Sequence, residues 1–89
     1  MGQREVKVAA LQVKTMPGTS REEKVEHILG LIEKASHDGC QIIMPPELCT
    51  TDYEKFYTKD PEYFSLAEPV PGPSTEAVEK LTKKFGNYV

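Results

Sequence analysis

The chain has 89 residues, of which 38% are hydrophobic and 28% are charged, and its formal net charge is −3. The length fits one small domain or part of a larger one, which buries only about 60–65% of its unfolded surface. The acidic balance argues against a nucleic-acid or anionic-membrane partner, and no apolar run reaches the roughly 18 residues needed to span a bilayer. The first residues lack a signal-peptide core, so we expect a cytoplasmic protein whose Cys40 and Cys49 are free thiols.

The first predicted element is a β-strand at residues 5–13. Its apolar side chains alternate between two faces, one carrying Val6, Val8 and Ala10, and the other carrying Ala9, Leu11 and Val13. Because both faces are apolar from Val8 onward, we expect this strand to be covered on both sides, as in α/β sheets. A loop with the Pro17-Gly18 turn signal follows the strand.

A helix is predicted to follow Ser20. Ser20 and Glu23 have the spacing of a capping box, in which each side chain bonds the backbone of the other residue. Apolar residues then recur at helical spacing on one stripe: Val25, Ile28, Leu29, Ile32 and Ala35. Gly39 is placed to end the helix in a left-handed conformation.

A second short strand is predicted at residues 40–44, which completes a parallel, right-handed βαβ unit. This strand stops at two prolines, and the next residue is Glu47. Ligands of α/β proteins bind at the carboxyl ends of parallel strands. A carboxylate held there by a proline is therefore a candidate catalytic residue.

Residues 49–72 contain several prolines and are predicted to be irregular, with a short helix at 52–56 or 61–67. Ser74 is expected to cap a last helix that ends at Gly86 and has one apolar face, formed by Ala77, Val78, Leu81 and Phe85. Tyr88 and Val89 then have the composition expected of the first residues of a third strand. We therefore expect residues 1–89 to be the N-terminal segment of a longer, here truncated, α/β domain.

The order of these features resembles that of the nitrilase superfamily, the carbon–nitrogen hydrolases, over residues 5–89. The first strand ends in Gln12, an A-x-x-x-G-x-x-I-I pattern at 35–43 leads into Pro46-Glu47-Leu48, and an A-E-x-x-P-G-P-S turn spans 67–74. Each piece is weak alone, but their shared order and spacing make the resemblance specific. Three positions depart from the family's usual pattern: Lys24, Pro45 and Asp52.

The resemblance implies both a fold and a reaction. The fold is a four-layer α-β-β-α sandwich, of which this chain supplies a βαβ core and a second helix. The reaction is hydrolysis of a non-peptide carbon–nitrogen bond in a small amide, nitrile or carbamoyl substrate. It uses a Glu-Lys-Cys triad, needs no cofactor, and takes place in a homo-oligomeric enzyme. Glu47 matches the general-base glutamate, and Tyr53 matches a position that lines the substrate pocket.

The lysine and the cysteine of the triad have no match in this chain. Cys40 is expected in the core, and Cys49 lies in a loop position unlike the family's nucleophile motif. The nearby Glu47 carboxylate is expected to raise the pKa of the Cys49 thiol. The two histidines, His27 and His37, have no metal-ligand spacing, so no metal site is expected. Without a nucleophile and a charge stabiliser, the chain alone is expected to be inactive.

Each assignment has a structural alternative. Glu47 could cap a nearby helix or form an ion pair, and a packed loop aromatic explains Tyr53 equally well. The whole chain could also be a complete small βαβ domain that acts as a non-catalytic interaction module. Such a module would pair the exposed edge of its sheet with a partner.

Overall fold

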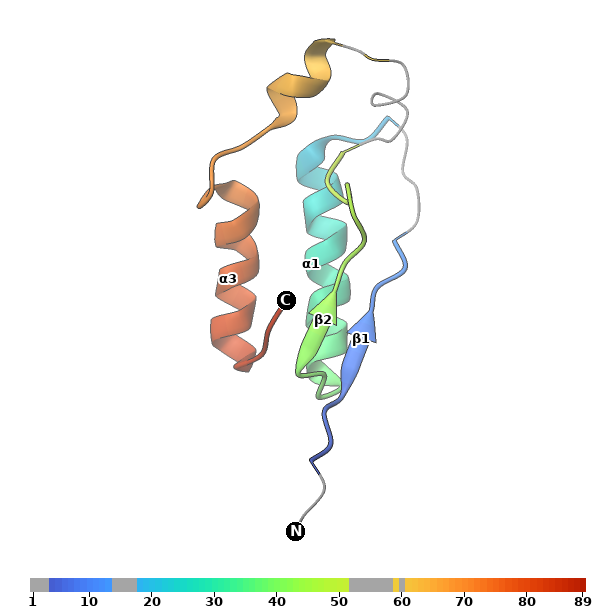
Figure 1. Cartoon of the computed structure of the whole chain (residues 1–89), viewed down its shortest axis with the longest axis vertical. Helices are drawn as coiled ribbons and strands as arrows, with labels where there is room; N and C mark the ends of the chain where they lie inside the picture. The colour runs from blue at the N-terminus through green and yellow to red at the C-terminus, as the bar shows by residue number, and fades with distance from the viewer. Residues whose placement is uncertain (1–3, 14–17, 52–58, 60) are drawn as a thin grey trace.

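The computed structural model describes residues 4–13, 18–51, 59 and 61–89 (Figure 1). In chain order the elements are strand β1 (Val8–Ala10), helix α1 (Arg21–His37), strand β2 (Ile42–Met44), the 3₁₀ helix η1 (Pro61–Leu66) and helix α3 (Pro73–Phe85). Of the two positions expected for a short helix, 61–67 coincides with η1, whereas 52–56 lies outside the described residues. No helix in the described part of the chain is long and apolar enough to cross a membrane.

The two strands form a parallel sheet, which confirms the predicted βαβ unit. The register pairs Val8 with Ile42 and Ala10 with Met44. Tyr88 continues the sheet on the other side of β2 through a parallel bridge to Ile42, in which the Tyr88 amide donates to the Gln41 carbonyl at 2.9 Å. Tyr88 therefore lies beside β2, where a third strand was expected to begin, but among the described residues it forms a single bridge and the sheet has two strands.

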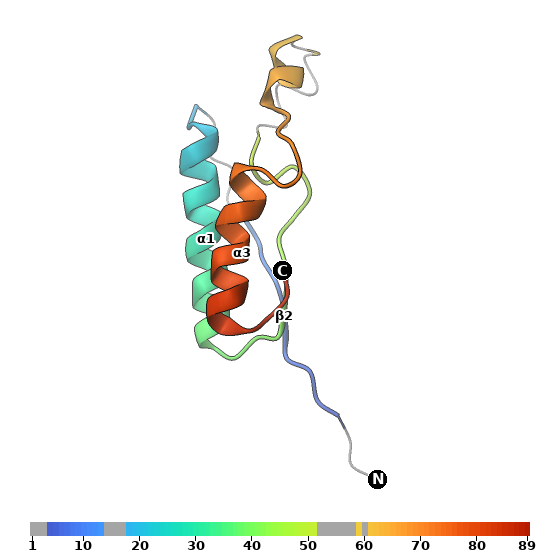
Figure 2. The ribbon, with the colours of Figure 1, turned by 90° about the vertical axis from the view of Figure 1, so that its left-hand side faces the viewer.

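Both long helices lie on one side of the sheet, as Figure 2 shows. The prediction that β1 is covered on both faces is wrong: Val8 is 63% exposed, whereas Ile43, on the opposite face of the sheet, is 1% exposed. The physical reason is the topology. When successive parallel strands add in one direction, right-handed crossovers place every connecting helix on the same face.

Local sequence signals set the ends of α1 as predicted. The Ser20 hydroxyl accepts from the Glu23 amide at 3.1 Å, and the Ser20 amide donates to the Glu23 carboxylate at 3.4 Å. At the other end Gly39 has a φ of 84°, and its amide and that of Cys40 donate to carbonyls of the last turn. These are the two bonds of a Schellman motif, which satisfies carbonyls that the helix itself leaves open.

The core forms where α1 crosses the covered face of the sheet. Its most buried members include Ile32, which is 0% exposed, and the others are Ile28, Cys40 and Ile43. Cys40 therefore occupies the core position predicted for it. Val78 and Leu81 of α3 pack against the same cluster. The helical stripe read from the sequence thus faces the core.

Two buried polar groups on α1 lie outside the predicted stripe. Lys24 is only 7% exposed, and its ammonium donates to the carbonyl and hydroxyl of Thr19, both at 2.7 Å. Ser36 donates to the Ile32 carbonyl at 2.7 Å and accepts from the Asn87 amide group at 2.8 Å. Burial of these groups is tolerated because each has hydrogen-bond partners. Asn87 thereby fastens the end of α3 to the end of α1.

Helix α3 begins two residues earlier than the sequence suggested. Ser74 is not its N-cap: the cap is Gly72, and Ser74 is the second helical residue. The backbone amide of Ser74 donates to the Glu68 carboxylate at 2.7 Å, and the Thr75 hydroxyl accepts from the Gly72 amide at 2.7 Å. The Glu68 carboxylate, from the turn before the helix, thus satisfies the amide of Ser74, which is one of the first-turn amides without a partner inside the helix.

Gly72 has no room for a side chain. A Cβ atom built there would overlap the Pro69 carbonyl oxygen and lie 3.4 Å from the Glu68 carboxylate. We expect Gly72→Ala to lower the free energy of unfolding by about 1–3 kcal/mol, because the turn must shift to relieve the overlap.

The matched control is Gly30→Ala in α1, where nothing lies within 4 Å of the added Cβ. This change is expected to raise the free energy of unfolding by about 0.5–1 kcal/mol through helix propensity. Urea denaturation of both variants tests the pair. Equal effects at the two glycines would contradict the crowding at Gly72.

Candidate functional site

The candidate catalytic glutamate lies at the carboxyl end of β2, as predicted. The strand ends at Met44, Pro45 and Pro46 follow, and Glu47 opens a turn that extends through Thr50. The prolines stop the strand because neither can donate a backbone hydrogen bond. Glu47 therefore projects from a fixed corner of the sheet rather than from a helix.

The residue after the glutamate has an unusual backbone. Leu48 has a φ of 52°, in the left-handed region that a bulky residue rarely adopts. Such a conformation costs about 1–3 kcal/mol and occurs most often where a site needs a particular backbone direction. No feature of the sequence around Leu48 indicated it, because glycine or asparagine usually marks this conformation.

Glu47 is an exposed residue in this structure. General-base carboxylates usually work in a less polar surrounding. The described residues do not supply that surrounding. A buried environment for Glu47 would have to come from further protein covering the end of β2.

Cys49 lies two residues after Glu47, in the same turn. It is half-buried, packs against the core cluster, and lines an apolar groove of about 410 Å³ between α1 and α3. Burial raises the pKa of the Cys49 thiol. The predicted direction is confirmed, but the cause is desolvation rather than repulsion by the Glu47 carboxylate. A half-buried thiol with a raised pKa is a poor nucleophile, which agrees with a structural role.

Two other expectations for the site concern Tyr53 and a metal ion. Tyr53, the candidate substrate-binding residue, lies outside the described residues. Within the ranges that the structure describes, no group of three or more His, Cys, Asp or Glu side chains is placed to hold a metal ion.

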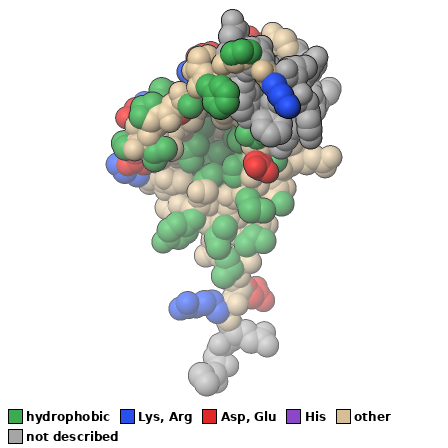
Figure 3. Space-filling model, turned by 45° about the horizontal axis from the view of Figure 1, so that its top comes forward, with side chains coloured by type: hydrophobic (Ala, Val, Ile, Leu, Met, Phe, Trp, Pro, Cys, Tyr) green, Lys and Arg blue, Asp and Glu red, His purple; other side chains and the backbone are tan. Residues whose placement is uncertain are grey.

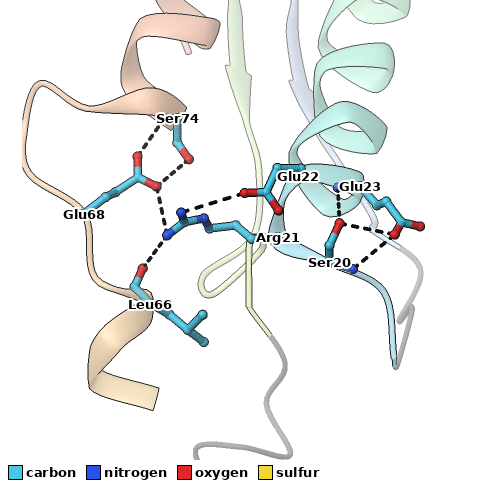
Figure 4. Close-up of polar contacts among 7 residues, drawn as sticks. All are labelled: Ser20, Arg21, Glu22, Glu23, Leu66, Glu68 and Ser74. Atoms are coloured by element: carbon cyan, nitrogen blue, oxygen red, sulfur yellow. Dashed lines mark hydrogen bonds and ion pairs between the residues drawn. The ribbon is translucent and has the colours of Figure 1, made fainter. Parts of the chain in front are cut away.

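A second corner, residues 66–74, is built around Glu68 (Figure 4). Glu68 accepts from both the amide and the hydroxyl of Ser74, at 2.7 and 2.9 Å. The Arg21 guanidinium, from the first turn of α1, lies 3.7 Å from the Glu68 carboxylate and donates to the Leu66 carbonyl at 2.9 Å. These contacts join the start of α1, the end of η1 and the start of α3.

This corner and the turn after Glu47 meet at a polar cavity of about 270 Å³. Its lining includes Arg21, Thr50, Thr51 and Ser65. The Thr51 hydroxyl is buried and has no hydrogen-bond partner in the structure. The first turn of α1, the end of η1 and the turn after Glu47 therefore border one cavity, which the sequence alone did not indicate.

Because of Glu68, the stability of the fold should vary with pH in the acidic range. The Ser74 amide, the Ser74 hydroxyl and the Arg21 charge, in that order, hold the pKa of Glu68 below its ordinary value of 4.5. A lowered folded-state pKa stabilises the protein above the unfolded value and loses that contribution as the pH falls through the folded value. We expect Glu68→Gln to be less stable than wild type at pH 7, with a difference that shrinks below about pH 4.5.

Thermal unfolding at a series of pH values measures this effect. Glu76→Gln is the matched control, because Glu76 is exposed in the first turn of the same helix. A Glu68→Gln deficit that stays constant from pH 7 to strongly acidic pH would show that the charge of Glu68 does not contribute.

Comparison with known proteins identifies the family. The sequence profile of the carbon-nitrogen hydrolases matches residues 7–89. The chain is 33% identical over 69 residues to the omega-amidase NIT2 of Bos taurus and 35% identical over 69 residues to that of Xenopus tropicalis. Each match covers 78% of this chain but only 23% of the relative. No solved structure gives a significant match.

The chain thus spans about a quarter of the length of these curated relatives. Within that span, the profile match extends from β1 to the residues that follow α3. The chain belongs to the carbon–nitrogen hydrolase family, that is, to the nitrilase superfamily.

Proposed function

We propose that this chain is the N-terminal part of a thiol-dependent carbon–nitrogen hydrolase and that Glu47 is its general base. One observation carries the proposal: within a chain of this family, Glu47 stands in the Pro-Glu-Leu corner at the carboxyl end of a parallel strand. The backbone of Leu48, in a rarely adopted conformation, supports a functional role for the same corner.

In the proposed reaction Glu47 takes the proton of a cysteine thiol as its sulfur attacks the amide carbon. Glu47 then gives that proton to the leaving nitrogen, and a lysine stabilises the charge on the carbonyl oxygen. A water molecule, deprotonated by Glu47, afterwards cleaves the thioester and restores the thiol. The thiol and the lysine come from parts of the enzyme outside this chain, because Cys40 is core and Cys49 is half-buried.

The substrate is proposed to be a small amide rather than a nitrile. The relatives from Bos taurus and Xenopus tropicalis are both named omega-amidases, which supports this choice. Tyr53 is proposed to line the substrate pocket, by its position after the Pro-Glu-Leu corner. In the complete enzyme, the uncovered face of the sheet is proposed to pack inside a four-layer α-β-β-α sandwich. The family membership favours this function over the non-catalytic interaction module.

A chimeric enzyme tests the proposal. Residues 7–89 of this chain replace the matching segment of the Bos taurus omega-amidase, and amide hydrolysis is measured. We expect an active chimera, because the chain supplies the base and its supporting corner. A chimera that unfolds cooperatively, as a folded enzyme does, but hydrolyses no amide would overturn the proposal. The isolated 89-residue chain, measured beside it, is expected to be inactive.

A further inference from the structure

Residues 47–51, which we call the Glu47 turn, depend on other elements to keep their shape. Leu48 has a φ of 52°, and a bulky residue keeps such a conformation only where the neighbouring structure holds it. Within the turn, the Thr51 amide donates to the Leu48 carbonyl at 3.4 Å, which is long for a backbone hydrogen bond. Contacts from outside the turn therefore have to contribute to its geometry.

The end of η1 faces the Glu47 turn. Two cavities, of about 270 and 250 Å³, are each bordered by residues of the turn and by residues from the range 64–67. Thr50, Thr51 and Leu66 line both cavities, so these three residues lie at the wall between them. Cavities of this size leave this side of the turn less tightly packed than a protein core. The position of the turn then depends on where the end of η1 is held.

Arg21, the first residue of α1, fastens the end of η1. Its guanidinium donates to the Leu66 carbonyl at 2.9 Å and lies 3.7 Å from the Glu68 carboxylate (Figure 4). The amide and hydroxyl of Ser74 hold that carboxylate in place. A hydrogen bond from a charged donor is stronger than one between neutral groups, and the Arg21 side chain is only 27% exposed. One side chain thus joins α1 to the segment that faces the Glu47 turn.

We propose that Arg21 is a positioning residue for the Glu47 turn, which acts through the end of η1 rather than by contact with the substrate. A planar guanidinium suits this role, because it donates to a carbonyl and faces a carboxylate at the same time. Without Arg21, residues 64–67 move away from the turn, and the turn opens more often while the core stays folded. The link to catalysis rests on the proposed function, whereas the effect on the turn does not.

The two cysteines report these events separately. Cys49 belongs to the Glu47 turn and is half-buried beside the apolar groove between α1 and α3. Figure 3 shows hydrophobic side chains in the hollow beside α3. Cys40 is 7% exposed and lies in the core. Opening of the turn exposes the Cys49 thiol alone, whereas loss of the fold exposes both thiols.

Alkylation of the 89-residue chain by iodoacetamide, with mass spectrometry of the two cysteine peptides, tests the proposal. We expect Arg21→Gln to raise the alkylation rate of Cys49 about tenfold, which is the change in an opening equilibrium that loss of one hydrogen bond from a charged donor produces. The rate at Cys40 should stay within about twofold of wild type, because the core stays closed.

Two further variants make the result specific. Arg21→Lys should give an intermediate rate at Cys49, because a single ammonium keeps the charge but does not reproduce both contacts. The matched control is Lys34→Gln, which removes the same charge from an exposed position in the last turn of α1 and should change neither rate. Circular dichroism checks that each variant keeps its helices.

Kinetics of the active chimera connect the turn to catalysis. Arg21→Gln should lower kcat about tenfold or more, because a small displacement of a catalytic group is costly. KM should stay within about twofold, since the substrate is bound before the proton moves. Arg21→Lys should recover part of kcat, and Lys34→Gln should leave it unchanged.

Each part of the proposal has a result that would overturn it. In a variant that keeps its helices, an unchanged rate at Cys49, or equal acceleration at Cys49 and Cys40, would remove the role of Arg21 in the turn. An active chimera with an unchanged kcat after Arg21→Gln would remove the link to catalysis. The proposed function fails on different evidence, namely a folded but inactive chimera, and the two alkylation rates would still decide what Arg21 does.

Discussion

In the active chimera, Glu47→Gln is expected to lower kcat for amide hydrolysis by about 10²- to 10⁴-fold, the usual contribution of a general base. Glutamine keeps the size of the side chain but cannot accept the thiol proton. KM should change much less than kcat, because proton transfer stabilises the transition state rather than the bound substrate. Steady-state kinetics of the purified chimera measure both constants.

The control for this prediction is Glu26→Gln, which removes the same charge from the exposed side of α1. It should leave kcat within about twofold of the unchanged chimera, since surface substitutions away from a site have small effects. If Glu47→Gln were no more harmful than Glu26→Gln, the general base would be another residue, and Glu47 would have a structural role at the corner.

The largest effect on stability is expected for Ile32→Ala. Ile32 is 0% exposed at the centre of the core, where α1 packs on β2. Removing three methyl or methylene groups there should lower the free energy of unfolding by about 2–5 kcal/mol, through lost burial and a residual cavity. A domain of this size has a total stability of only about 4–13 kcal/mol, so this loss is a large fraction of the total.

Urea denaturation measures this loss. Ile42→Ala is the matched control, because the same atoms are removed from a side chain that is 47% exposed on the uncovered face of the sheet. Its cost should be clearly smaller, and Ile32→Val should cost about 0.5–1.5 kcal/mol. Similar losses for Ile32→Ala and Ile42→Ala would place the packing centre elsewhere.

Several local features of the chain could be predicted from its sequence. Ser20 and Glu23 start α1, Gly39 follows its end, and Tyr88 lies beside β2, all as expected. These features depend on hydrogen bonds and sterics within a few residues, which a sequence pattern records directly. The family also followed from sequence, because the order and spacing of its motifs are properties of the chain.

The start of α3 was predicted less well because its cap comes from outside the helix. Ser74 has the right chemistry for an N-cap, but Glu68 reaches its amide across a proline turn. The sequence gives no means of ranking these two oxygens, since the choice depends on how the turn folds back. The same turn excludes a side chain at Gly72.

The sequence by itself determined the family, the βαβ unit and the position of Glu47 after β2. Only the tertiary structure decided which faces are buried. Val8 and Ile43 are both apolar strand residues, yet Val8 lies on the uncovered face of the sheet and Ile43 lies in the core. Their difference arises from right-handed crossovers that place α1 and α3 on the same side of the sheet, and from side chains that alternate along each strand.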